Sequence, residues 1–530
     1  MRVTAAAPPA KETHLVTPPT RHRKFASRLV AVVAGAAALA LVTAGCTSSS
    51  TSTTTSGDGG TLNWASGQDP TSWDPVVDGS GAVFRVTSLA YASLTTTNEK
   101  GEAEPALAKS WKYNSDGTQV TFTLRSGLKF SDGTALDSTA VKDYFVRAQT
   151  QKTSALVGEG ISVIKSIDTP DATSVVMNLS QPDYQIPLVV AERVGQITNP
   201  KYTTAQLAQK PEGAGPFKAV TVVPGSKAVF VKNPNYWDAK DIHIKNVNVS
   251  FGVDPTQVVS GLQSGVYNFA DLAASQAKSA KAAGLDVVVQ PGFNATNLSV
   301  NTTIAPFNNP KVLEAVQYAV NRKQIVDQAD FGYGTPAYEP FPSNYIAYDK
   351  GSANKYPYNP KKAKQLLAEA GYPNGFSVTF TVGTLVPTAE NELLQAQLKA
   401  VGINATLKVD PNWATSFFAK KLPISTYGTT GRDSPVQTLQ AHFGATGALN
   451  SSGKDGGAAY QAAISKALAT PLTSPDYQKN IQAATAAGMA TTGLIFTDTL
   501  PNLFVKTKAV SSIPKIPAKV TWTGVTISGS

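Results

Sequence analysis

Apolar and polar residues alternate with a period of two in several stretches of the chain, which is the pattern of a strand that buries one face. The clearest case is Val120, Phe122 and Leu124, which alternate with polar side chains at the positions between them. Asp116-Gly117 comes just before this stretch and predicts a tight turn, because glycine tolerates a positive φ. We therefore expect a hairpin here, preceded by a short amphipathic segment that ends at Trp111.

Apolar positions spaced three and four residues apart predict helices elsewhere. Asp137 or Ser138 offers a cap for a helix that runs to Ala148. Further helices are expected at residues 82–95, 311–327, 361–370, 460–468 and 476–490. Residues 340–358 have no clear period and are expected to form a long loop.

Strands and helices also follow one another in an α/β order. Strand, helix and strand are predicted at residues 247–251, 255–264 and 265–269, and again at 376–382, 389–400 and 403–409. Residues 161–167 and 174–179 are expected to pair as strands, with a turn at Thr169-Pro170-Asp171.

The first 45 residues have the composition of a secretory signal peptide. A basic stretch is followed by an apolar run at residues 29–42, which is too short for a comfortable membrane span. Thr43-Ala44-Gly45 precedes Cys46 and resembles a lipobox, where the peptide is cut and the cysteine is acylated. We expect residues 1–45 to be the signal peptide and 46–60 to be the acylated cysteine with a flexible Ser/Thr/Gly tether. The alternative is an ordinary signal peptide with an incidental cysteine.

The formal net charge of +10 at pH 7 raises the question of a nucleic-acid partner. Half of it, +5, belongs to residues 1–45, and the rest of the chain carries 40 basic and 35 acidic residues. No run of Arg and Lys with interleaved aromatic residues occurs. We therefore expect no nucleic-acid binding.

Material for enzymatic or metal chemistry is scarce. The chain has one cysteine and four histidines, of which only His243 and His442 follow the signal peptide. One cysteine excludes an intrachain disulfide and a multi-cysteine metal site, and neither HExxH nor GxSxG occurs. We expect a non-enzymatic protein with no cofactor and no metal, and these observations disfavour the alternative of a secreted hydrolase.

Several motifs follow one another in an order that identifies a family. Within residues 104–147 the motif positions are Pro105, Leu107, Ala108, Ser110, Trp111, Asp116, Gly117, Phe122, Leu124, Arg125, Gly127, Phe130, Asp132 and Gly133. GAGPF at 213–217, NPNYW at 233–237 and YNPKKAKQLLAEAGYPNGF at 358–376 come later. Together they resemble the family 5 extracellular solute-binding proteins of ABC importers, and the resemblance covers nearly everything from residue 61 onward.

The resemblance implies an α/β fold of the periplasmic-binding-protein type II, with two α/β lobes, a cleft between them and a small accessory lobe. The first large lobe is expected from residues 61–97, 196–290 and 495–530. The accessory lobe is expected from residues 98–195, and the second large lobe from residues 291–494.

The resemblance also implies a function. The expected role is to capture a peptide or similar small solute and deliver it to the permease and ATPase subunits of an ABC importer. The expected location is the extracytoplasmic face of the cell membrane, held by the lipid anchor. A ligand sensor that signals through a membrane partner would need the same fold, and an oligosaccharide is the alternative ligand class.

Two loops resemble ligand-binding loops of the family. The first is a strand-to-helix loop that contains Trp413. The second stretch is residues 427–435, which begins at Tyr427. In peptide-binding relatives an acidic residue of the second stretch pairs with the α-ammonium of the substrate. Here Ser434 takes the common acidic position, so that Asp433, which follows Arg432, is the candidate substitute.

The chain segment that crosses into the second lobe adds Phe293 and Asn294 to the candidates. Peptide capture relies on a carboxylate and main-chain pairing, whereas oligosaccharide capture needs stacked aromatic rings. The expected ligand-binding residues are Phe293, Asn294, Trp413, Tyr427, Arg432 and Asp433.

Overall fold

The computed structural model describes residues 59–78, 81–151, 155–384, 386, 388–429, 431–451 and 454–528. The expected signal peptide, Cys46 and nearly all of the tether lie outside the described residues. Within the described ranges, no helix combines the length and the apolar composition needed to span a bilayer.

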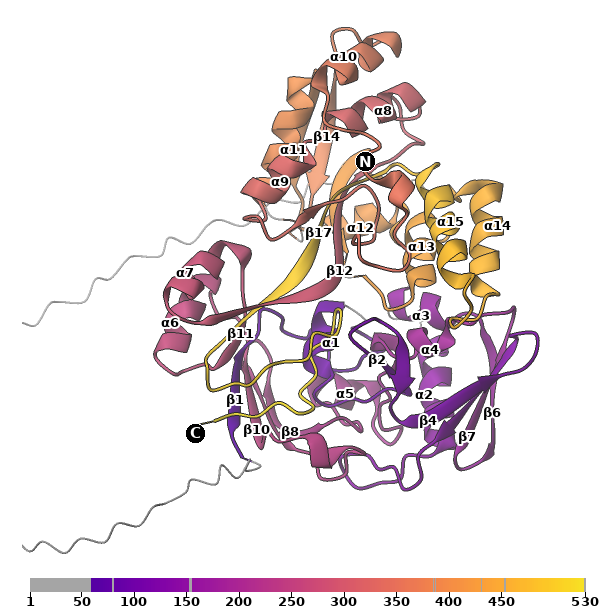
Figure 1. The fold of residues 1–530 in the computed structure, drawn as a ribbon, viewed down its shortest axis with the longest axis vertical. Helices are drawn as coiled ribbons and strands as arrows, with labels where there is room; N and C mark the ends of the chain where they lie inside the picture. Colours follow the sequence, from indigo (N-terminus) through magenta and orange to yellow (C-terminus); the bar gives the residue numbers. More distant parts are fainter. Residues whose placement is uncertain are drawn as a thin grey trace, which may run out of the picture. The chain divides into compact units, whose positions relative to one another are not determined.

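In the described part of the chain, eleven strands form one mixed sheet (Figure 1). The order is β15-β14-β16-β12-β17-β11-β1-β10-β9-β8, and β13 pairs with β17 beside this path. The strands are β1 (Thr61–Ala65), β8 (Phe217–Val223), β9 (Lys227–Lys232), β10 (Asn246–Ser250), β11 (Phe269–Asp271), β12 (Asp286–Val300), β13 (Thr335–Pro336), β14 (Phe376–Val382), β15 (Ile403–Val409), β16 (Ile424–Thr429) and β17 (Leu494–Lys506).

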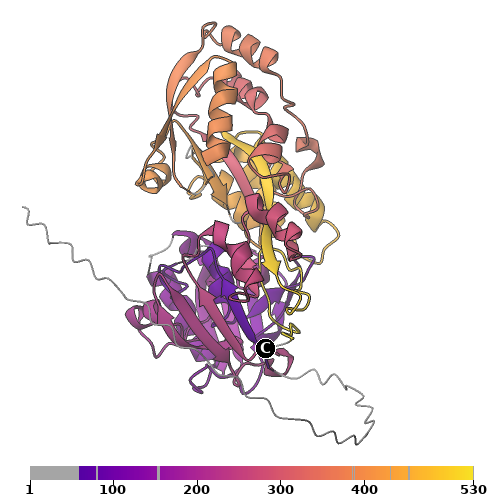
Figure 2. The same cartoon turned by 90° about the vertical axis from the view of Figure 1, so that its left-hand side faces the viewer.

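Two long strands, β12 and β17, join the two ends of this sheet. They pair antiparallel, and β12 also pairs with β16 while β17 also pairs with β11. Figure 1 shows both strands running between β11 and β14, and Figure 2 shows the yellow β17 beside β12 from the second direction. Their register shifts twice, between Gln290 and Asn294 and between Thr296 and Asn297.

A separate antiparallel sheet, here called the accessory sheet, has the order β4-β5-β7-β6. Val120, Phe122 and Leu124 are buried and alternate with half-buried residues, which confirms the predicted strand. Gly117 has a φ of +73°, as the predicted turn requires. The strands are β4 (Ala108–Tyr113), β5 (Gln119–Leu124), β6 (Ile164–Asp171) and β7 (Ser174–Leu179), and a further pair is β2 (Thr95–Thr97) with β3 (Ala103–Pro105).

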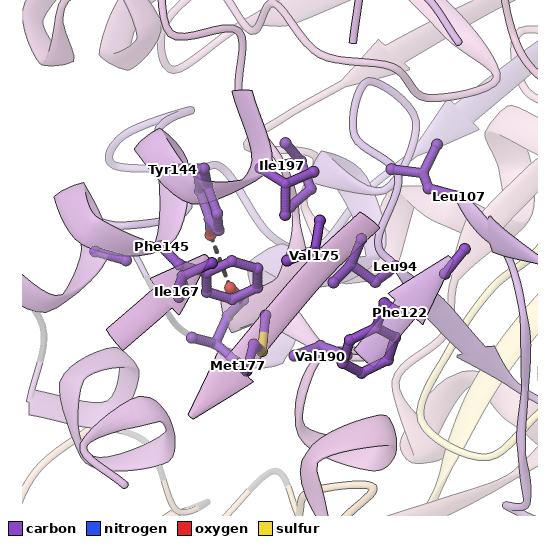
Figure 3. Close-up of a cluster of buried hydrophobic side chains, with 14 of the residues drawn as sticks. Leu94, Leu107, Phe122, Tyr144, Phe145, Ile167, Val175, Met177, Val190 and Ile197 are labelled. Atoms are coloured by element: carbon purple, nitrogen blue, oxygen red, sulfur yellow. Dashed lines mark hydrogen bonds between the residues drawn. The ribbon is translucent and has the colours of Figure 1, made fainter. Parts of the chain in front are cut away.

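Helix α2 (Ser138–Thr150) packs against the accessory sheet, and it begins at the predicted cap, Asp137. Tyr144 and Phe145 of this helix are buried in one cluster with Val175 and Met177 of β7 (Figure 3). The hydroxyl of Tyr144 donates to the carbonyl of Val194 at 2.9 Å. The accessory sheet and α2 therefore share a core.

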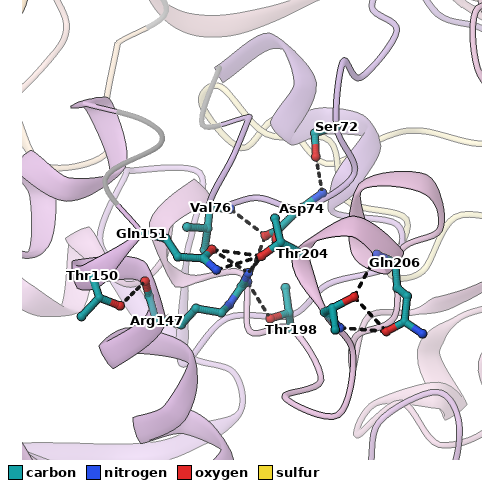
Figure 4. A network of polar contacts seen from close by, with 10 residues as sticks. Ser72, Asp74, Val76, Arg147, Thr150, Gln151, Thr198, Thr204 and Gln206 are labelled. Carbon is teal, nitrogen blue, oxygen red and sulfur yellow. Dashed lines mark hydrogen bonds and ion pairs between the residues drawn. The ribbon is translucent and has the colours of Figure 1, made fainter.

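Arg147 connects α2 to the loop after β1 (Figure 4). Its two terminal nitrogens lie 2.6 and 2.9 Å from the two carboxylate oxygens of Asp74, whose side chain is fully buried. Arg147 also donates to Thr198 Oγ1 at 3.1 Å, and Asp74 accepts from the backbone N–H of Val76 at 3.0 Å. This bidentate ion pair joins three separate chain segments.

The other helices pack on the sheets. Helices α8, α10 and α11 share one core with β14 and β15, and α13, α14 and α15 share another with β12 and β17. Their bounds are α1 (Gly81–Thr87), α3 (Ala155–Ile161), α4 (Ile186–Val189), α5 (Thr204–Gln209), α6 (Val258–Gln263), α7 (Ala277–Ala282), α8 (Pro310–Ala319), α9 (Arg322–Gln328), α10 (Pro360–Glu369), α11 (Thr388–Ala400), α12 (Trp413–Phe418), α13 (Pro435–Phe443), α14 (Gly457–Leu468) and α15 (Tyr477–Met489). Short 3-10 helices occur at Arg193–Gly195, Ala239–Asp241, Pro255–Gln257, Ala274–Gln276 and Lys350–Ser352.

The structure confirms the predicted helices α10, α14 and α15 and the order β14, α11, β15. The loop at 340–358 is confirmed apart from one 3-10 turn. The predicted strands near 247 and 269 are β10 and β11, but β1 lies between them in the sheet.

The single helix predicted at residues 311–327 is wrong, because the chain forms α8 and α9 there. Val320 is extended, and the side chain of Asn321 accepts the backbone N–H of Gln324, which starts a second helix. The backbone N–H of Asn321 donates to Gln397 Oε1 at 2.9 Å. The cap from the side chain of Asn321 and the tertiary contact of its backbone with Gln397 therefore outweigh the apolar period across this position.

Two other local predictions, a turn and a helix length, are also wrong. The turn expected at Thr169-Pro170-Asp171 comes later, at residues 172–173, because Pro170 is tolerated in β6, an edge strand. The amphipathic segment before Trp111 contains β3, which pairs with β2, and most of β4, which pairs with β5. The helix expected at residues 82–95 ends at Thr87.

Candidate functional site

Two of the expected ligand-binding residues, Trp413 and Tyr427, belong to a stack of aromatic rings. The ring of Phe417 lies 4.7 Å from that of Trp413 and 5.0 Å from that of Tyr427, with interplanar angles of 25° and 9°. Trp413 is only 4% exposed, and its indole N–H donates to Ser425 Oγ at 2.6 Å. The structure thus places Trp413 in a core contact beneath β16.

Phe293 and Asn294 lie on β12, beside its first register shift. The carbonyl of Phe293 accepts the backbone N–H of Gly431 at 2.9 Å, and a Cβ at residue 431 would lie 2.1 Å from that of Phe293. Asn294 Nδ2 donates to Asn502 Oδ1 at 3.0 Å and to the carbonyl of Leu500 at 3.2 Å. Strand β12 therefore contacts both the loop before α13 and strand β17.

Arg432 and Asp433 lie in the loop that leads into α13. Ser434 caps this helix, because its hydroxyl oxygen accepts the backbone N–H of Gln437 at 3.3 Å. One carboxylate oxygen of Glu192 accepts the backbone N–H of Asp433 and that of Ser434, the latter at 3.2 Å. Glu192 therefore fixes this loop from a segment 241 residues away in the sequence.

Lys519 neutralises the side chain of Asp433. Its Nζ lies 2.5 Å from Asp433 Oδ2 and donates to Thr97 Oγ1 and to the carbonyl of Ala191, both at 2.9 Å. The two charged side chains are 9% and 2% exposed. This ion pair is buried, so that removing one partner would leave an uncompensated charge.

Burial controls the ionisation of the neighbouring groups. Burial, together with the nearby carboxylate of Asp433, raises the pKa of Glu192 to about 7, although nearby cations oppose the shift. Burial lowers the pKa of Arg193. Arg193 donates to the carbonyl of Gly431 at 3.2 Å and lies 3.7 Å from the second carboxylate oxygen of Glu192.

A small cavity of about 20 Å³, here called the central cavity, lies among these residues. Of the six expected residues, Asn294 and Asp433 belong to its lining and the other four do not. The full lining is Gly81, Phe84, Arg85, Glu192, Arg193, Asn294, Gly431, Asp433, Asn502, Ala518 and Lys519.

The central cavity lies where three hydrophobic cores meet. The segment of Glu192 contributes Val190 to the core of the accessory sheet. Lys519 is followed by Val520, which belongs to the core around β1. The helix after Asp433 belongs to the core of α13, α14 and α15. Charged side chains from segments that adjoin three different cores therefore converge on one cavity.

A larger cavity of about 360 Å³, here called the side cavity, shares Arg85 and Asn502 with the central cavity. Arg85 Nη1 donates to Asn502 Oδ1 at 2.9 Å, and the guanidinium carbon lies 5.7 Å from the ring centre of Phe504. Arg85 thus stands between the two cavities. The lining of the side cavity is Ala65, Ser66, Gly67, Gln68, Arg85, Val253, Pro255, Val258, Asp271, Leu272, Ala273, Ala274, Tyr333, Leu500, Pro501, Asn502, Leu503 and Phe504.

Sequence reasoning missed Arg85, Glu192, Arg193, Asn502 and Lys519. A local signal existed for some of them, because Glu192-Arg193 is the only charged pair in the mostly apolar IPLVVAERVGQI at residues 186–197. Lys519 likewise stands in IPAKVTW. Charged residues are seldom buried unless they are paired, so a charge inside an apolar run indicates a buried partner.

Across the described ranges, no group of three or more His, Cys, Asp or Glu side chains is placed to hold a metal ion. The side chains around the central cavity instead form ion pairs and hydrogen bonds with the protein itself.

Comparison with known proteins gives a consistent result. A family model described as bacterial extracellular solute-binding proteins, family 5 Middle, matches residues 102–450. The chain is 29% identical over 395 residues to heme-binding protein A of Haemophilus influenzae, covering 67% of this chain and 71% of that protein. It is 32% identical over 349 residues to the glutathione-binding protein GsiB of Escherichia coli K12, covering 64% of this chain and 68% of that protein.

Two solved structures have the same fold. The first is the periplasmic binding protein DppA from Helicobacter pylori in complex with the peptide STSA, with a TM-score of 0.80 and 23% identity over 89% of this chain and 98% of that one. The second is the binding protein AgaA from A. tumefaciens R10 in complex with agropinic acid, with a TM-score of 0.78 and 25% identity over 89% of this chain and 99% of that one. The predicted periplasmic-binding-protein type II fold is therefore confirmed. The family match and these likenesses show that the chain belongs to the family 5 bacterial extracellular solute-binding proteins, the non-enzymatic binding components of ABC importers.

Proposed function

We propose that this protein captures a peptide or similar small solute in a cleft around the central and side cavities and delivers it to the permease and ATPase subunits of an ABC importer. The observation that carries the proposal is the convergence of charged and amide side chains from distant segments on one cavity. Glu192 and Asp433, which lie 241 residues apart, both line it. DppA, which has the same fold, is described with a bound peptide.

The six expected residues have separate parts in this proposal. Asn294 and Asp433 line the central cavity, where they contact or position the ligand. Phe293 belongs to strand β12 behind these two residues, and its ring lies 4.6 Å from that of Tyr345. Arg432 belongs to the loop before α13. Trp413 and Tyr427 hold the adjacent strand β16 in place through their ring stack, whose Trp413 and Tyr427 ring centres are 5.7 Å apart.

We also propose the lobe boundaries and the anchor implied by the family resemblance. The separate accessory sheet and its own core support an accessory lobe within residues 98–195. The acylation of Cys46 would hold the protein at the extracytoplasmic face of the membrane. Mass spectrometry of the mature N-terminus tests this, and cleavage at a site other than the bond before Cys46 would contradict it.

Native mass spectrometry of protein purified without denaturation from the producing cell tests the main proposal. We expect a co-purified small solute, which is absent after unfolding and refolding in ligand-free buffer. Calorimetry with that solute should then give saturable binding without turnover. Turnover of the solute would contradict the proposal and support a hydrolase.

Uptake of the same labelled solute by intact cells tests the delivery step. We expect deletion of this protein to abolish high-affinity uptake, and re-expression to restore it. Binding of the solute with unchanged uptake would contradict the importer role and support the alternative of a ligand sensor.

A further inference from the structure

The two carboxylates that line the central cavity are both engaged by the protein itself. Glu192 accepts two backbone N–H groups from the loop before α13. The charge of Asp433 is neutralised by Lys519, whose Nζ is 2.5 Å from Asp433 Oδ2. Both carboxylates are therefore already used to hold chain segments together.

Three oxygens surround the ammonium group of Lys519. Two of them accept its hydrogen bonds, and the third, Asp433 Oδ2, forms an ion pair with it. The three oxygens are a carboxylate oxygen of Asp433, the hydroxyl of Thr97 and the carbonyl of Ala191, at 2.5, 2.9 and 2.9 Å. A ligand ammonium would have to displace Lys519 from this site, so that the chain itself competes against amine ligands.

Arg85 is the contrasting case. Its Nη1 donates to a neutral partner, Asn502 Oδ1, and its Nε has no hydrogen-bond partner. Among the residues that the structure describes, no carboxylate lies within ion-pair distance of Arg85. Arg85 lines both cavities and is only partly buried. A half-buried guanidinium without a counter-ion attracts an anion, and its planar fork fits a carboxylate.

We propose that Lys519 permanently fills the ammonium site of the cleft and that Arg85 receives the carboxylate of a small acidic solute, which needs no free amine. This inference rests on the proposed function and names the ligand class of the same cleft. Three cationic and two acidic side chains line the central cavity, an excess of one positive charge there, whereas the side cavity has Arg85 and Asp271 in its lining. A carboxylate bound beside Arg85 in the central cavity balances the local excess, whereas a cationic group at that place would increase it.

The size of the cavities agrees with a small solute. The side cavity, at about 360 Å³, lies near the lower end of the volumes that bind small molecules. Ser66, Gln68 and Tyr333 of its lining offer hydroxyl and amide groups to the remainder of the solute. Arg85, at the junction with the central cavity, would fix the charged end.

Chemical rescue tests the first half of the proposal. In full-length Lys519→Ala the three oxygens lose their ammonium, and ethylammonium chloride at ~50 mM should refill the site. We expect the melting temperature of Lys519→Ala to rise by about 3 °C over the same concentration of sodium chloride. The wild type and Lys515→Ala, which removes an exposed lysine four positions earlier, should not respond. No specific response of Lys519→Ala, or an equal response of the wild type, would overturn the ammonium site.

Carboxylate binding tests the second half. We expect sodium propionate at ~50 mM to raise the melting temperature of the wild type by about 2 °C over sodium chloride. Arg85→Gln should lose this response, while Lys278→Gln, which removes the same charge from an exposed position on α7, should keep it. An unresponsive wild type, or an Arg85→Gln variant that responds as the wild type does, would overturn the role of Arg85.

The solute found by native mass spectrometry separates this inference from the proposed function. An imported solute that is cationic or neutral would refute the acidic ligand class and leave the importer role intact. Unchanged uptake after deletion would refute the importer role, whereas the two melting experiments would still decide the roles of Lys519 and Arg85.

Discussion

Replacing Asp74 by Asn should destabilise the protein strongly, because Asp74 forms a buried bidentate pair with Arg147. The variant keeps an acceptor for the backbone N–H of Val76, which lies 3.0 Å from Asp74 Oδ1. What it loses is the charge opposite the two guanidinium nitrogens at 2.6 and 2.9 Å. The change therefore isolates the ion pair from the turn that surrounds it.

The magnitude follows from burial. Breaking a buried pair by neutralising one partner costs about 3–5 kcal/mol, and the 20% exposure of the Arg147 side chain argues for the lower value, about 3 kcal/mol. An unfolding entropy of ~2.1 cal/mol/K per residue gives about 1 kcal/mol/K for the unit of residues 56–530. We expect the melting temperature to fall by about 3 °C if this unit unfolds cooperatively.

Differential scanning calorimetry of the variant measures this shift. The matched control is Asp327→Asn, which breaks the exposed ion pair of Asp327 with Lys323. The Lys323 side chain is 78% exposed and that of Asp327 is 51% exposed. This control should change the stability by less than about 0.5 kcal/mol. The double variant Asp74→Asn/Arg147→Met should cost less than the sum of its two single changes, because it leaves no unpaired buried charge. A shift for Asp74→Asn no larger than that of the control, or strict additivity in the double variant, would refute the reasoning.

Three further predictions concern buried groups. Burial lowers the pKa of His442 to about 4, so the unfolded chain binds a proton at higher pH than the folded protein does, and about 3 kcal/mol of folding stability is lost as the pH falls from 6.5 to 4. His442→Gln should remove this dependence of stability on pH, measured by urea titration. An unchanged pH dependence would contradict the assignment. Burial and neighbouring carboxylates raise the pKa of Glu390, so its contribution to folding stability is present below pH ~4.3 and is lost as the pH rises toward the raised pKa. Glu390→Gln should therefore stabilise the protein more at pH ~9 than at pH ~5. An equal effect at both pH values would count against the raised pKa. Gly488→Ala would place a methyl group 2.2 Å from the ring of Phe443 and should lower the stability by about 1–3 kcal/mol. In the control Gly158→Ala the new methyl group has no atom within 4 Å, so this change should stabilise its helix by up to ~1 kcal/mol. Equal urea midpoints for the two variants would rule out the predicted clash.

Local patterns predicted the elements that are stabilised by neighbours in the sequence. Asn359 caps α10, the helix predicted at residues 361–370, and its side chain accepts the backbone N–H of Lys362 at 3.0 Å. Gly371 has a φ of +89° just after that helix, which is the conformation that ends it. In both places the deciding interaction spans four residues or fewer.

Long strands could not be predicted in the same way. Strand β17 extends from Leu494 to Lys506 because it pairs with β12 over most of its length. Such pairing joins segments about 200 residues apart, and its register depends on tertiary contacts rather than on local propensity. The break between α8 and α9 has a similar origin, since the backbone N–H of Asn321 donates to Gln397.

The candidate site was predictable only in part. The family resemblance led to Asp433 and Asn294, and both line the central cavity. The partners of Asp433, Glu192 and Lys519, come from segments 241 and 86 positions away, and no spacing rule connects such distant charges. Trp413 matched a binding loop, yet its indole N–H is held by Ser425 and its ring is covered by Phe417. Sequence located the loops, and packing decided which of their side chains face the cavity.

The two register shifts in β12 and β17 have a mechanical consequence. A hydrogen-bonded ladder resists twisting wherever it is continuous, so that torsional compliance concentrates where its register is interrupted. The first interruption contains Pro291, which has no N–H to donate, and Gly292, which has no side chain to pack. Asn294 is the residue at which the ladder resumes, and it also lines the central cavity. The first interruption of the ladder therefore adjoins the proposed ligand site, so that a ligand bound there would act on this bend directly, without passing through the hydrophobic cores.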